Sequence, residues 1–359
     1  MALDVRCWVE IDEAAFRHNI RSIASRYASP AALMVAVKAN AYGHGAARMA
    51  QLALEEGAAA LAVLDVETGC ALREEFPDVP MLCWLLSPGS DYRGAIEASL
   101  TLGISHRWQL EAIRAVGSSK RAVVHLKIDT GLHRNGALAA NWPELTRLAA
   151  ECEQEGSIRV EGVWSHLADT SLEEDRASLQ RFHGAVDLAR DAGLSPSVLH
   201  IAASAAAADL PEARLDMVRV GLLAYGVSPS EERPIEEYGL QPVMSFRAFV
   251  GAVDEASGEC VLECGYTDGL LPLPENTGHV SLGGQRVDIR HIGPDRTTVV
   301  LGAASPRVGD IATLWGPGAP GAPRVEDWAA WAGTIGDEVI AGVAAHVRRV
   351  YLGEGANRS

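Results

Sequence analysis

The sequence predicts an α/β protein in which an N-terminal (β/α)8 TIM barrel precedes a mainly-β C-terminal domain. Over roughly the first 220 residues, short apolar runs alternate with longer segments of helical periodicity. After residue 230 the pattern changes to short runs separated by turn dipeptides. The length of 359 residues, with 48% hydrophobic and 22% charged residues, allows two such domains in a globular protein.

Eight apolar runs are the candidate strands of the barrel. They are residues 33–37, 61–64, 81–86, 100–104, 122–128, 160–164, 198–201 and 217–221. Segments with helical spacing, such as residues 45–56 and 179–192, lie between them. An open doubly wound sheet is the alternative fold, but such a sheet rarely contains eight regular units.

The second domain is predicted from short alternating runs that follow a polar linker at residues 228–237. Its candidate strands are residues 243–253, 259–266, 279–284, 285–292, 297–301 and 310–315. Dipeptides such as Gly283-Gly284 and Gly309-Asp310 mark the turns. The predicted domains are residues 1–230 and residues 231–359, with residues 1–12 available to pair with the second domain.

Composition restricts the partners and the compartment. The formal net charge of −16 argues against nucleic acid as a partner, because like charges repel. No apolar run reaches the roughly 18 residues of a membrane span, and the N-terminus lacks a signal-peptide layout. The six cysteines form no CxxC pair and no metal-ligand spacing. We therefore expect a cytoplasmic protein with free thiols, no membrane association and no metal.

Polar residues follow the candidate strands at the end where barrels carry their catalytic groups. The first strand leads to Lys38, and the next polar positions are Lys127, Arg134, His166, Ser204, Arg219 and Gly221. Because the C-terminal ends of barrel strands meet at one rim, we expect these residues to line a single pocket.

Two features of this pocket fit pyridoxal 5′-phosphate. The ends of the last two strands commonly form a phosphate site, and here they carry Ser204, Gly221 and Leu222. Small residues let backbone N–H groups approach an anion, and Tyr42 adds a hydroxyl group. Lys38 supplies the amine that such a cofactor needs for a Schiff base.

Each residue taken alone also has an ordinary structural explanation. Lys38 fits a surface lysine whose stem is buried, His166 a core histidine, and Tyr42 a core aromatic residue. Ser204 fits simple packing among alanines. Arg219 is harder to explain in this way, because a guanidinium on a buried strand costs several kcal/mol unless it is paired. The set is more specific than any member.

Five motifs of the first domain resemble those of the alanine racemase family. They are VAVKANAYGHG (35–45), HLKIDTGLHRNG (125–136), EGVWSHLAD (161–169), LHIAASA (199–205) and LDMVRVGLLAYGVSP (215–229). LQPVMSF (240–246), GYTDG (265–269) and VGDIATLWG (308–316) extend the resemblance into the second domain. It implies a fold type III enzyme that forms a head-to-tail homodimer. Each active site would combine one barrel with the partner's second domain.

The resemblance also implies roles by position. It assigns the cofactor shell to Lys38, Tyr42, His166, Ser204, Arg219, Gly221 and Leu222, with Arg219 facing the pyridine nitrogen. It assigns binding of a small-molecule amino acid to Arg134, Lys127 and Asp295, and Lys127 matches a lysine that is often carbamylated. An arginine does not give up its proton to the pyridine nitrogen, which favours removal and return of the Cα proton over transamination.

This sequence departs from the family's pattern at three places. The family has a second acid–base tyrosine between its VMSF and GYTDG motifs, but residues 247–265 contain no tyrosine. The family's Met-Asp pair becomes Pro294-Asp295, and its Tyr-Arg-x-Pro-Arg becomes AHVRR at residues 345–349. We expect Tyr266 to be the substitute base. The further candidates are Asp295, Cys264 and His346.

Three functions remain open. The motifs favour an amino-acid racemase in which Lys38 is one of two acid–base groups. The alternative is a one-base enzyme of the same fold that performs decarboxylation, elimination or aldol-type cleavage. A non-catalytic cofactor-binding protein is the third. The retention of Lys127 and Arg134 speaks against it, because a pure binder need not hold a substrate carboxylate.

Overall fold

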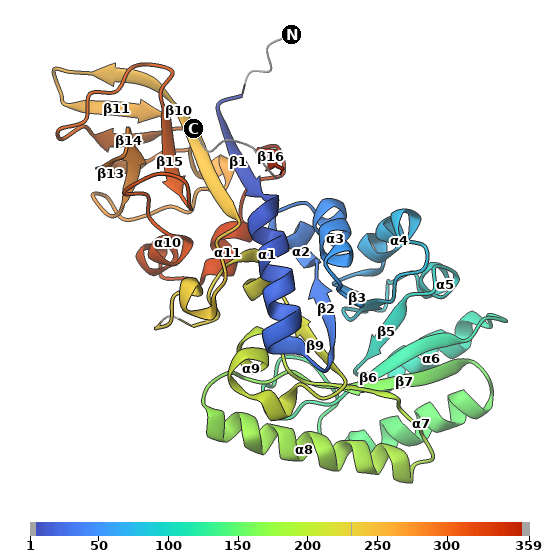
Figure 1. Ribbon diagram of the computed structural model, residues 1–359. Coiled ribbons are helices and arrows are strands. Elements are labelled where there is room, and N and C mark those ends of the chain that lie inside the picture. Colours follow the sequence, from blue (N-terminus) through green and yellow to red (C-terminus); the bar gives the residue numbers. More distant parts are fainter. Residues whose placement is uncertain (1–4, 231, 354–359) are drawn as a thin grey trace. The chain divides into compact units, whose positions relative to one another are not determined.

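The computed structural model describes residues 5–230 and 232–353 and divides into two compact units (Figure 1). The barrel unit comprises Ile20–Lys38 and Ala47–Gly221. The β unit comprises Met1–Asn19, Ala39–Ala46 and Leu222–Ser359. Among the helices of the described ranges, none has the length and apolar character needed to cross a bilayer.

The barrel unit confirms the predicted (β/α)8 architecture. Its eight parallel strands have the order β8-β7-β6-β5-β4-β3-β2-β9. Their bounds are β2 (Ala32–Ala36), β3 (Ala60–Val63), β4 (Met81–Cys83), β5 (Thr101–Ile104), β6 (Ala122–Lys127), β7 (Ile158–Trp164), β8 (Val198–His200) and β9 (Met217–Val220). The N–H of Asp216 donates to the carbonyl of Leu199, and the N–H of Arg219 donates to that of Ala202, both at 3.1 Å. These bonds join β8 to β9 and close the sheet.

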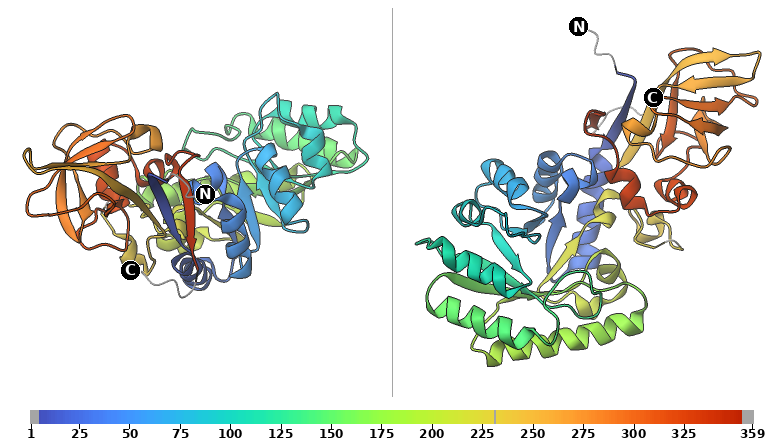
Figure 2. Two further views of the ribbon diagram at one scale, coloured as in Figure 1. Left: turned by 90° about the horizontal axis from the view of Figure 1, so that it is seen from above. Right: turned by 180° about the vertical axis from the view of Figure 1, so that it is seen from behind.

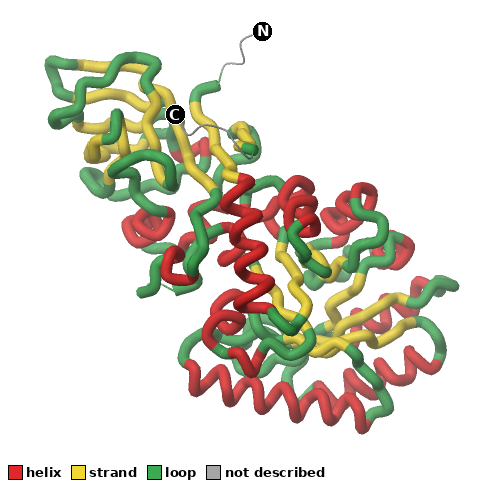
Figure 3. Tube along the Cα trace, in the orientation of Figure 1, coloured by secondary structure: helices red, strands yellow, loops and turns green. Residues whose placement is uncertain are grey.

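The helices of this unit lie outside its strands (Figure 3). They are α3 (Ala46–Glu55), α4 (Val66–Glu75), α5 (Tyr92–Glu97), α6 (Arg107–Val116), α7 (Trp142–Gln154), α8 (Leu172–Asp191) and α9 (Ser204–Asp209). The chain enters through α1 (Glu13–Ile23) and a π-helical turn, η1 (Ala24–Ala28). The longest of these helices, α8, is preceded by its N-cap residue Ser171, whose hydroxyl accepts the N–H of Glu174 at 3.2 Å. Each helix follows a loop at the C-terminal end of a strand, where the polar residues lie.

The β unit is built around one long strand, β10 (Met244–Asp254). Strands β11, β14, β13, β12, β15 and β10 pair in this order, and β11 pairs back with β10, so six strands form a closed antiparallel ring. β1 and β16 extend the sheet from β10. The remaining bounds are β1 (Cys7–Asp12), β11 (Glu259–Leu262), β12 (His279–Leu282), β13 (Gln285–Ile292), β14 (Thr297–Val300), β15 (Ile311–Trp315) and β16 (Arg348–Leu352). Figure 2 shows these strands from two further sides.

Short helical segments complete the β unit. The helices are α2 (Lys38–Tyr42), α10 (Val325–Ala332) and α11 (Gly336–Ala341), and the single turns are η3 (Leu222–Tyr225), η4 (Ile235–Tyr238) and η5 (Tyr266–Asp268). The first residue of α2, Lys38, is also the last residue of the barrel unit's first segment. A further turn, η2 (Pro211–Ala213), lies in the barrel unit. Each of the six predicted runs overlaps one strand from β10 to β15, and β1 lies in the residues expected to be available for pairing, whereas β16, α10 and α11 were not predicted.

We expect Gly226→Ala to lower the free energy of unfolding by about 3 kcal/mol, because an added Cβ would be strained and overpacked. Gly226 has φ +69°, and a Cβ there would lie 1.9 Å from the carbonyl oxygen of Gln241. Gly333 is the matched control, because its φ is +68° and nothing lies within 4 Å. Gly333→Ala should cost only about 1 kcal/mol. Equal losses for the two variants in urea unfolding would contradict the prediction.

Candidate active site

Lys38 lies two residues after the end of the buried strand β2 and is half-buried. The next four residues, Ala39 to Tyr42, all have left-handed φ angles between 50° and 54°. Residues with a Cβ lose roughly 1–2 kcal/mol each in this conformation, so surrounding contacts must impose it. The backbone closes the turn with bonds from Gly43 N–H to the Ala39 carbonyl and from Gly45 N–H to the Asn40 carbonyl, at 3.0 and 2.9 Å.

C-terminal residues of the β unit hold this left-handed turn. Arg349 donates from Nε to the carbonyl of Gly43, and the hydroxyl of Tyr351 donates to the carbonyl of His44, both at 3.0 Å. A Cβ at Gly43 would lie 2.5 Å from the Ile340 carbonyl oxygen, so only glycine allows this approach. The backbone directly after Lys38 is therefore fixed by residues some three hundred positions later in the chain.

Two predicted phosphate residues, Tyr42 and Leu222, also belong to the β unit. Leu222 begins η3, which ends at the fully buried Tyr225. The rings of Tyr42 and His44 pack on Tyr225 with centroid distances of 5.0 and 4.7 Å. Burial lowers the pKa of His44 to about 4, so its ring is a neutral packing element at physiological pH.

Arg219 is buried inside the barrel, with 6% of its surface exposed. Its Nη1 donates to Nδ1 of His200 at 2.9 Å. Its Nη2 donates to the carbonyls of Ser165 and Ile201, at 2.7 and 3.1 Å, and to Nδ1 of His166 at 3.2 Å. Burial, followed by repulsion from nearby Arg134, lowers the pKa of Arg219 to about 9. The guanidinium therefore stays charged at neutral pH and fixed by four acceptors.

Lys127 and His166 lie in the same cationic surroundings. Lys127 is 4% exposed, and its Nζ lies 4.3 Å from the ring centroid of Trp164. Burial, with repulsion from Arg219 and Arg134, lowers the pKa of Lys127 to about 7. Burial and the charge of Arg219 likewise hold the pKa of His166 well below its usual range. His166 is consequently a neutral imidazole, and the Lys127 amine is partly uncharged near neutral pH.

Ser204 and Gly221 meet where the last two strands end. Ser204 is the first residue of α9, and its Oγ accepts the N–H of Gly221 at 3.2 Å. Four alanines follow Ser204, so no large side chain is attached to this stretch of backbone. The structure thus brings together the two barrel-unit residues predicted to hold a phosphate.

The loop that carries Arg134 is fixed at its base. The carboxylate of Asp129 accepts the N–H groups of Gly131 and His133 at 2.9 and 3.1 Å. Burial raises the pKa of Asp129, but these hydrogen bonds outweigh it and lower the pKa overall. Gly136 closes the loop, because a Cβ there would lie 2.8 Å from the Asp129 nitrogen. Arg134 itself is exposed at the tip.

The predicted second base, Tyr266, lies in the β unit with 47% of its surface exposed. Its N–H donates to the carbonyl of Gly293 at 3.0 Å, and the next N–H, of Thr267, donates to that of Pro294 at 2.8 Å. These bonds hold the GYTDG turn against the loop that carries Asp295. The side chain of Asp295 is also exposed. Tyr266 and Asp295 are thus on adjoining turns of one unit.

The carboxylate of Asp268 holds the GYTDG turn through hydrogen bonds. Its Oδ1 accepts from Nη2 of Arg6 at 3.2 Å and from Nε2 of His346 at 2.9 Å, and its Oδ2 accepts the Gly265 N–H at 2.9 Å. The Asp268 side chain is 1% exposed, whereas that of His346 is 60% exposed. His346, another base candidate, therefore has one nitrogen committed to a buried carboxylate and an exposed ring.

Cys264 is poorly suited to be a base. It is fully buried. Burial, with the neighbouring thiol of Cys7, raises its pKa well above the usual range. The thiols and a carboxylate oxygen of Asp268 lie within 4.8 Å of one another, a spacing compatible with a metal. Both oxygens of Asp268 already accept hydrogen bonds, however, so this cluster is satisfied without an ion.

The interval in which the family's tyrosine is expected forms a plain hairpin. β10 and β11 pair antiparallel from Val250 with Leu262 to Asp254 with Glu259. Only residues 255–258 lie between the two strands. The hairpin contains no tyrosine and leaves no loop in which one could project.

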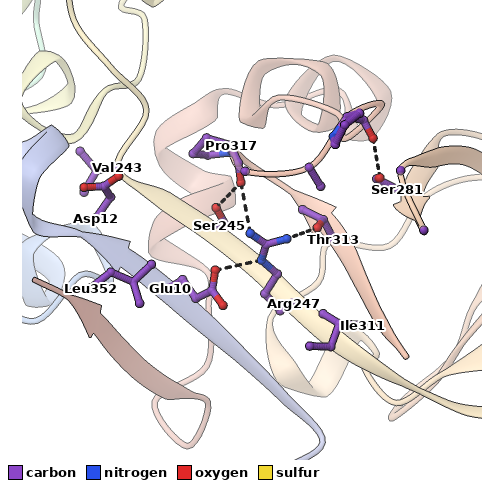
Figure 4. A pocket seen from close by; sticks show the side chains of 15 residues that line it. Glu10, Asp12, Val243, Ser245, Arg247, Ser281, Ile311, Thr313, Pro317 and Leu352 are labelled. Atoms are coloured by element: carbon purple, nitrogen blue, oxygen red, sulfur yellow. Dashed lines mark hydrogen bonds and ion pairs between the residues drawn. The ribbon is translucent and has the colours of Figure 1, made fainter. Parts of the chain in front are cut away.

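A second cavity in the β unit contains none of the predicted site residues (Figure 4). It measures about 410 Å³ and is lined by β1, β10 and β15 with the loop at 317–320. Its polar groups satisfy one another: Arg247 donates to Glu10 at 3.0 Å and to Thr313, and Ser245 donates to the Pro317 carbonyl at 2.7 Å. The barrel interior is the better candidate site because it holds two buried cations, Lys127 and Arg219.

Sequence reasoning missed three buried residues of the barrel pocket. Trp164 stacks on His200 with a centroid distance of 5.6 Å and an interplanar angle of 8°, and His200 contacts His125. His125 and Lys127 are two residues apart on β6, so their side chains lie on the same face of the strand. This spacing was the signal that could have identified His125.

The residues fit pyridoxal phosphate on three observations. A lysine stands at the end of a barrel strand, a charged arginine is fixed in the interior, and a serine and small residues lie where the last strands end. Among the described residues, none accepts a hydrogen bond from Nε of Arg219, which leaves a donor for a ring nitrogen. The cationic, partly apolar surroundings suit an anionic aromatic group.

Known proteins provide an independent comparison. The family models for the alanine racemase N-terminal and C-terminal domains match residues 11–229 and 251–351. The alanine racemase of Streptomyces coelicolor is 39% identical, over 98% of this chain and 97% of the relative. That of Frankia casuarinae is 39% identical over 97% of each. The solved alanine racemase from D-cycloserine producing Streptomyces lavendulae matches with a TM-score of 0.91 at 37% identity, covering 98% of both chains.

A closed (β/α)8 barrel whose pocket combines a strand-end lysine with a fixed, charged arginine defines a barrel enzyme dependent on pyridoxal phosphate. The chain belongs to the alanine racemase family. Enzymes of this family use pyridoxal 5′-phosphate, and the chain is accordingly an isomerase that depends on this cofactor.

Raising the pH above 7 should stabilise the wild-type fold relative to a Lys127→Met variant. Folded Lys127 has a pKa of about 7, whereas the unfolded lysine keeps its proton to about pH 10.4. Between these values the unfolded chain binds the extra proton, so the free energy of unfolding rises with pH. We expect the difference between the two proteins to change by up to about 1.4 kcal/mol per pH unit in this window.

Urea unfolding of both proteins in carbon dioxide-free buffer, from about pH 6 to about pH 10, measures this difference. Below pH 7 the difference should level off, because both states of Lys127 are then protonated. A difference that stays constant over the whole range would contradict the lowered pKa.

Proposed function

We propose that this protein racemises a small amino acid, with alanine as the first substrate to test. Lys38 would serve as one acid–base group and Tyr266 as the other. The full-length similarity to proteins named alanine racemase supports this reaction over others of the same fold. Pyridoxal phosphate, when bound, withdraws electrons from the Cα of the amino acid and makes its proton acidic.

The observation that carries the proposal is the fixed charge of Arg219. With a pKa of about 9, Arg219 offers a hydrogen bond at neutral pH but keeps its protons. A pyridine nitrogen beside Nε of Arg219 would therefore stay unprotonated. The cofactor ring would then withdraw electrons less strongly. A weak sink favours prompt return of a proton to Cα, the event that racemisation requires on either face.

The residues we propose for the cofactor shell serve its reactive carbon, its ring and its phosphate group. Lys38 would hold the cofactor covalently, and His166 would lie against its ring as a neutral imidazole. The phosphate group would be held by the Ser204 hydroxyl, the backbone at Gly221 and Leu222, and the Tyr42 hydroxyl.

Arg134 would bind the substrate carboxylate, with Asp295 as a further substrate-binding group. The fixed base of its loop supports this role, because the exposed guanidinium then moves less relative to the pocket. Lys127 would orient Arg134 as a carbamate. A partly uncharged amine can react with carbon dioxide, and the cations that lower its pKa would stabilise the resulting anion.

Racemisation needs a second proton carrier on the face opposite Lys38. Tyr266 is the best candidate because its side chain is exposed on a turn held by two backbone hydrogen bonds. Lys38 and Tyr266 would exchange roles between the two directions: one removes the Cα proton while the other returns one. Asp295 and His346 are the next candidates, and the buried Cys264 ranks below them.

The assembly and location remain proposals as well. We propose a head-to-tail homodimer in which the second domain of one subunit completes the partner's site, with domain limits at residues 1–230 and 231–359. The β unit's exposed acid–base groups support this arrangement, since they need a pocket on which to act. A cytoplasmic location stays a prediction from the sequence.

One observation favours a second candidate function, a one-base enzyme. The hairpin of β10 and β11 lacks the tyrosine that the family's pattern places there. If no other group serves the second face, Lys38 alone would move protons on one face only. Decarboxylation, elimination or aldol-type cleavage would then be the reaction, depending on which Cα bond is activated.

The wild-type enzyme should convert either enantiomer of alanine to the racemate in D₂O and introduce deuterium at Cα. Lys38→Ala should lower this rate by about a hundredfold or more, because it removes an acid–base group. Polarimetry and mass spectrometry measure the two quantities. Borohydride should attach the cofactor to Lys38 in the wild type and leave the variant unmodified. Deuterium entry with full retention, or release of carbon dioxide or ammonia, would favour the one-base enzyme instead.

Tyr266→Phe should lower racemisation by about a hundredfold while one enantiomer still exchanges its Cα proton with retention. The reason is that Lys38 continues to serve its own face. Asp295→Asn and His346→Gln are the comparison variants, measured in the same assay. If Tyr266→Phe racemises at the wild-type rate and one of the other two does not, the second base is that residue.

A further inference from the structure

A line of hydrogen bonds crosses the barrel from Arg219 to the opposite surface. Nη1 of Arg219 contacts Nδ1 of His200 at 2.9 Å, and Nε2 of His200 contacts Nδ1 of His125 at 2.8 Å. Nε2 of His125 reaches the carboxylate of Glu161 at 3.4 Å. Both histidines are buried, and Glu161 is 29% exposed in its side chain. The family assignment uses Arg219 but gives no role to His125 or Glu161.

The chemistry of the groups permits only one arrangement of protons along this line. A guanidinium can only donate, so Nδ1 of His200 must accept and its proton must be on Nε2. That proton is donated to His125, whose Nδ1 must therefore accept as well. The proton of His125 is then on Nε2, which faces a carboxylate that can only accept when ionised. The line therefore ends in a carboxylate that can accept the Nε2–H of His125.

We propose that His125 and Glu161 are positioning residues that fix the His200 tautomer and thereby hold the Arg219 guanidinium in place. This inference deepens the proposed function, because Arg219 acts on the reaction through the cofactor ring. Arg219 and Glu161 fix the direction of the bonds from the two ends of the line, because a guanidinium only donates and an ionised carboxylate only accepts.

The surroundings support a fixed acceptor at the outer end. The hydrogen bond from His125, with Arg159 at 2.8 Å, lowers the pKa of Glu161 to about 2, so the carboxylate stays ionised at neutral pH. Burial and the charge of Arg219 hold the pKa of His200 well below its usual range, so this ring remains neutral. A neutral ring has a tautomer to be chosen, and a charged one would have none.

Packing fixes the planes of the two rings. His200 stacks on Trp164, and Gly162 provides the space for His125. A Cβ at Gly162 would lie 2.9 Å from the His125 ring and 2.7 Å from the Val198 carbonyl oxygen. Glycine is therefore required beside Glu161 for the ring to reach both of its partners.

The tautomers can be measured by ¹⁵N NMR of histidine-labelled, full-length protein. In the wild type we expect the proton of both His200 and His125 on Nε2. Glu161→Lys places a second donor at the outer end of the line, in competition with Arg219, and should move both protons to Nδ1 with loss of the Arg219–His200 hydrogen bond. Glu161→Met, which adds no charge, should give a mixture, and Glu161→Gln, which keeps an acceptor oxygen, should restore Nε2–H.

Activity provides the second readout. We expect Glu161→Lys to lower kcat about tenfold with little change in KM and to shift the absorbance of the bound cofactor. Glu161→Gln should recover most of both. The matched control is Glu212→Lys, which makes the same charge change at the exposed pair with Arg176 and should alter neither readout.

Failure of this inference and failure of the proposed function have different signatures. A proton on Nδ1 of His200 in the wild type, or tautomers unchanged in both Glu161→Lys and Glu161→Met, would overturn the positioning role. A wild-type protein without racemase activity would contradict the proposed function, while the NMR result would still decide the role of Glu161.

Discussion

The site depends on the burial of one guanidinium inside the barrel. Leaving such a group unpaired would cost several kcal/mol, yet a directly paired anion would neutralise its charge. The barrel resolves this with neutral acceptors: two carbonyls and two imidazoles surround Arg219. This choice constrains the neighbours in turn. His166 and His200 must stay uncharged, and Lys127 loses much of its affinity for a proton.

A second constraint is the strain stored directly after Lys38. Four successive left-handed residues, three of which are Ala39, Ala41 and Tyr42, would not form this turn in isolation. The contacts that compensate come from Arg349, Tyr351 and the backbone near Ile340. The backbone conformation of residues 39–45 therefore depends on the C-terminal segments of the same unit being folded.

The apolar runs were sufficient to predict the barrel strands, because each run is a continuous buried segment bounded by a polar residue such as Lys38. The ends of these runs also indicated which polar residues to assign to a pocket, and that assignment stays a prediction. The sequence could not predict the left-handed turn, because Ala39 and Ala41 disfavour that conformation and only distant contacts impose it. The helices α10 and α11 were missed because 8 and 6 residues give too few turns for a period to appear. His200 was missed because a buried strand is apolar on both faces and hides which side chains point inward.

The β10–β11 hairpin contains no tyrosine, and the β unit carries exposed acid–base groups elsewhere. Tyr266 stands on a turn that Asp268 holds through the Gly265 N–H, and the same carboxylate fixes one nitrogen of His346. Asp268 thus organises both a phenol and an imidazole from one buried position. Cys264, beside them, cannot share this role, since burial keeps its thiol protonated. The candidates for a second proton carrier are therefore a few groups ordered by a single carboxylate.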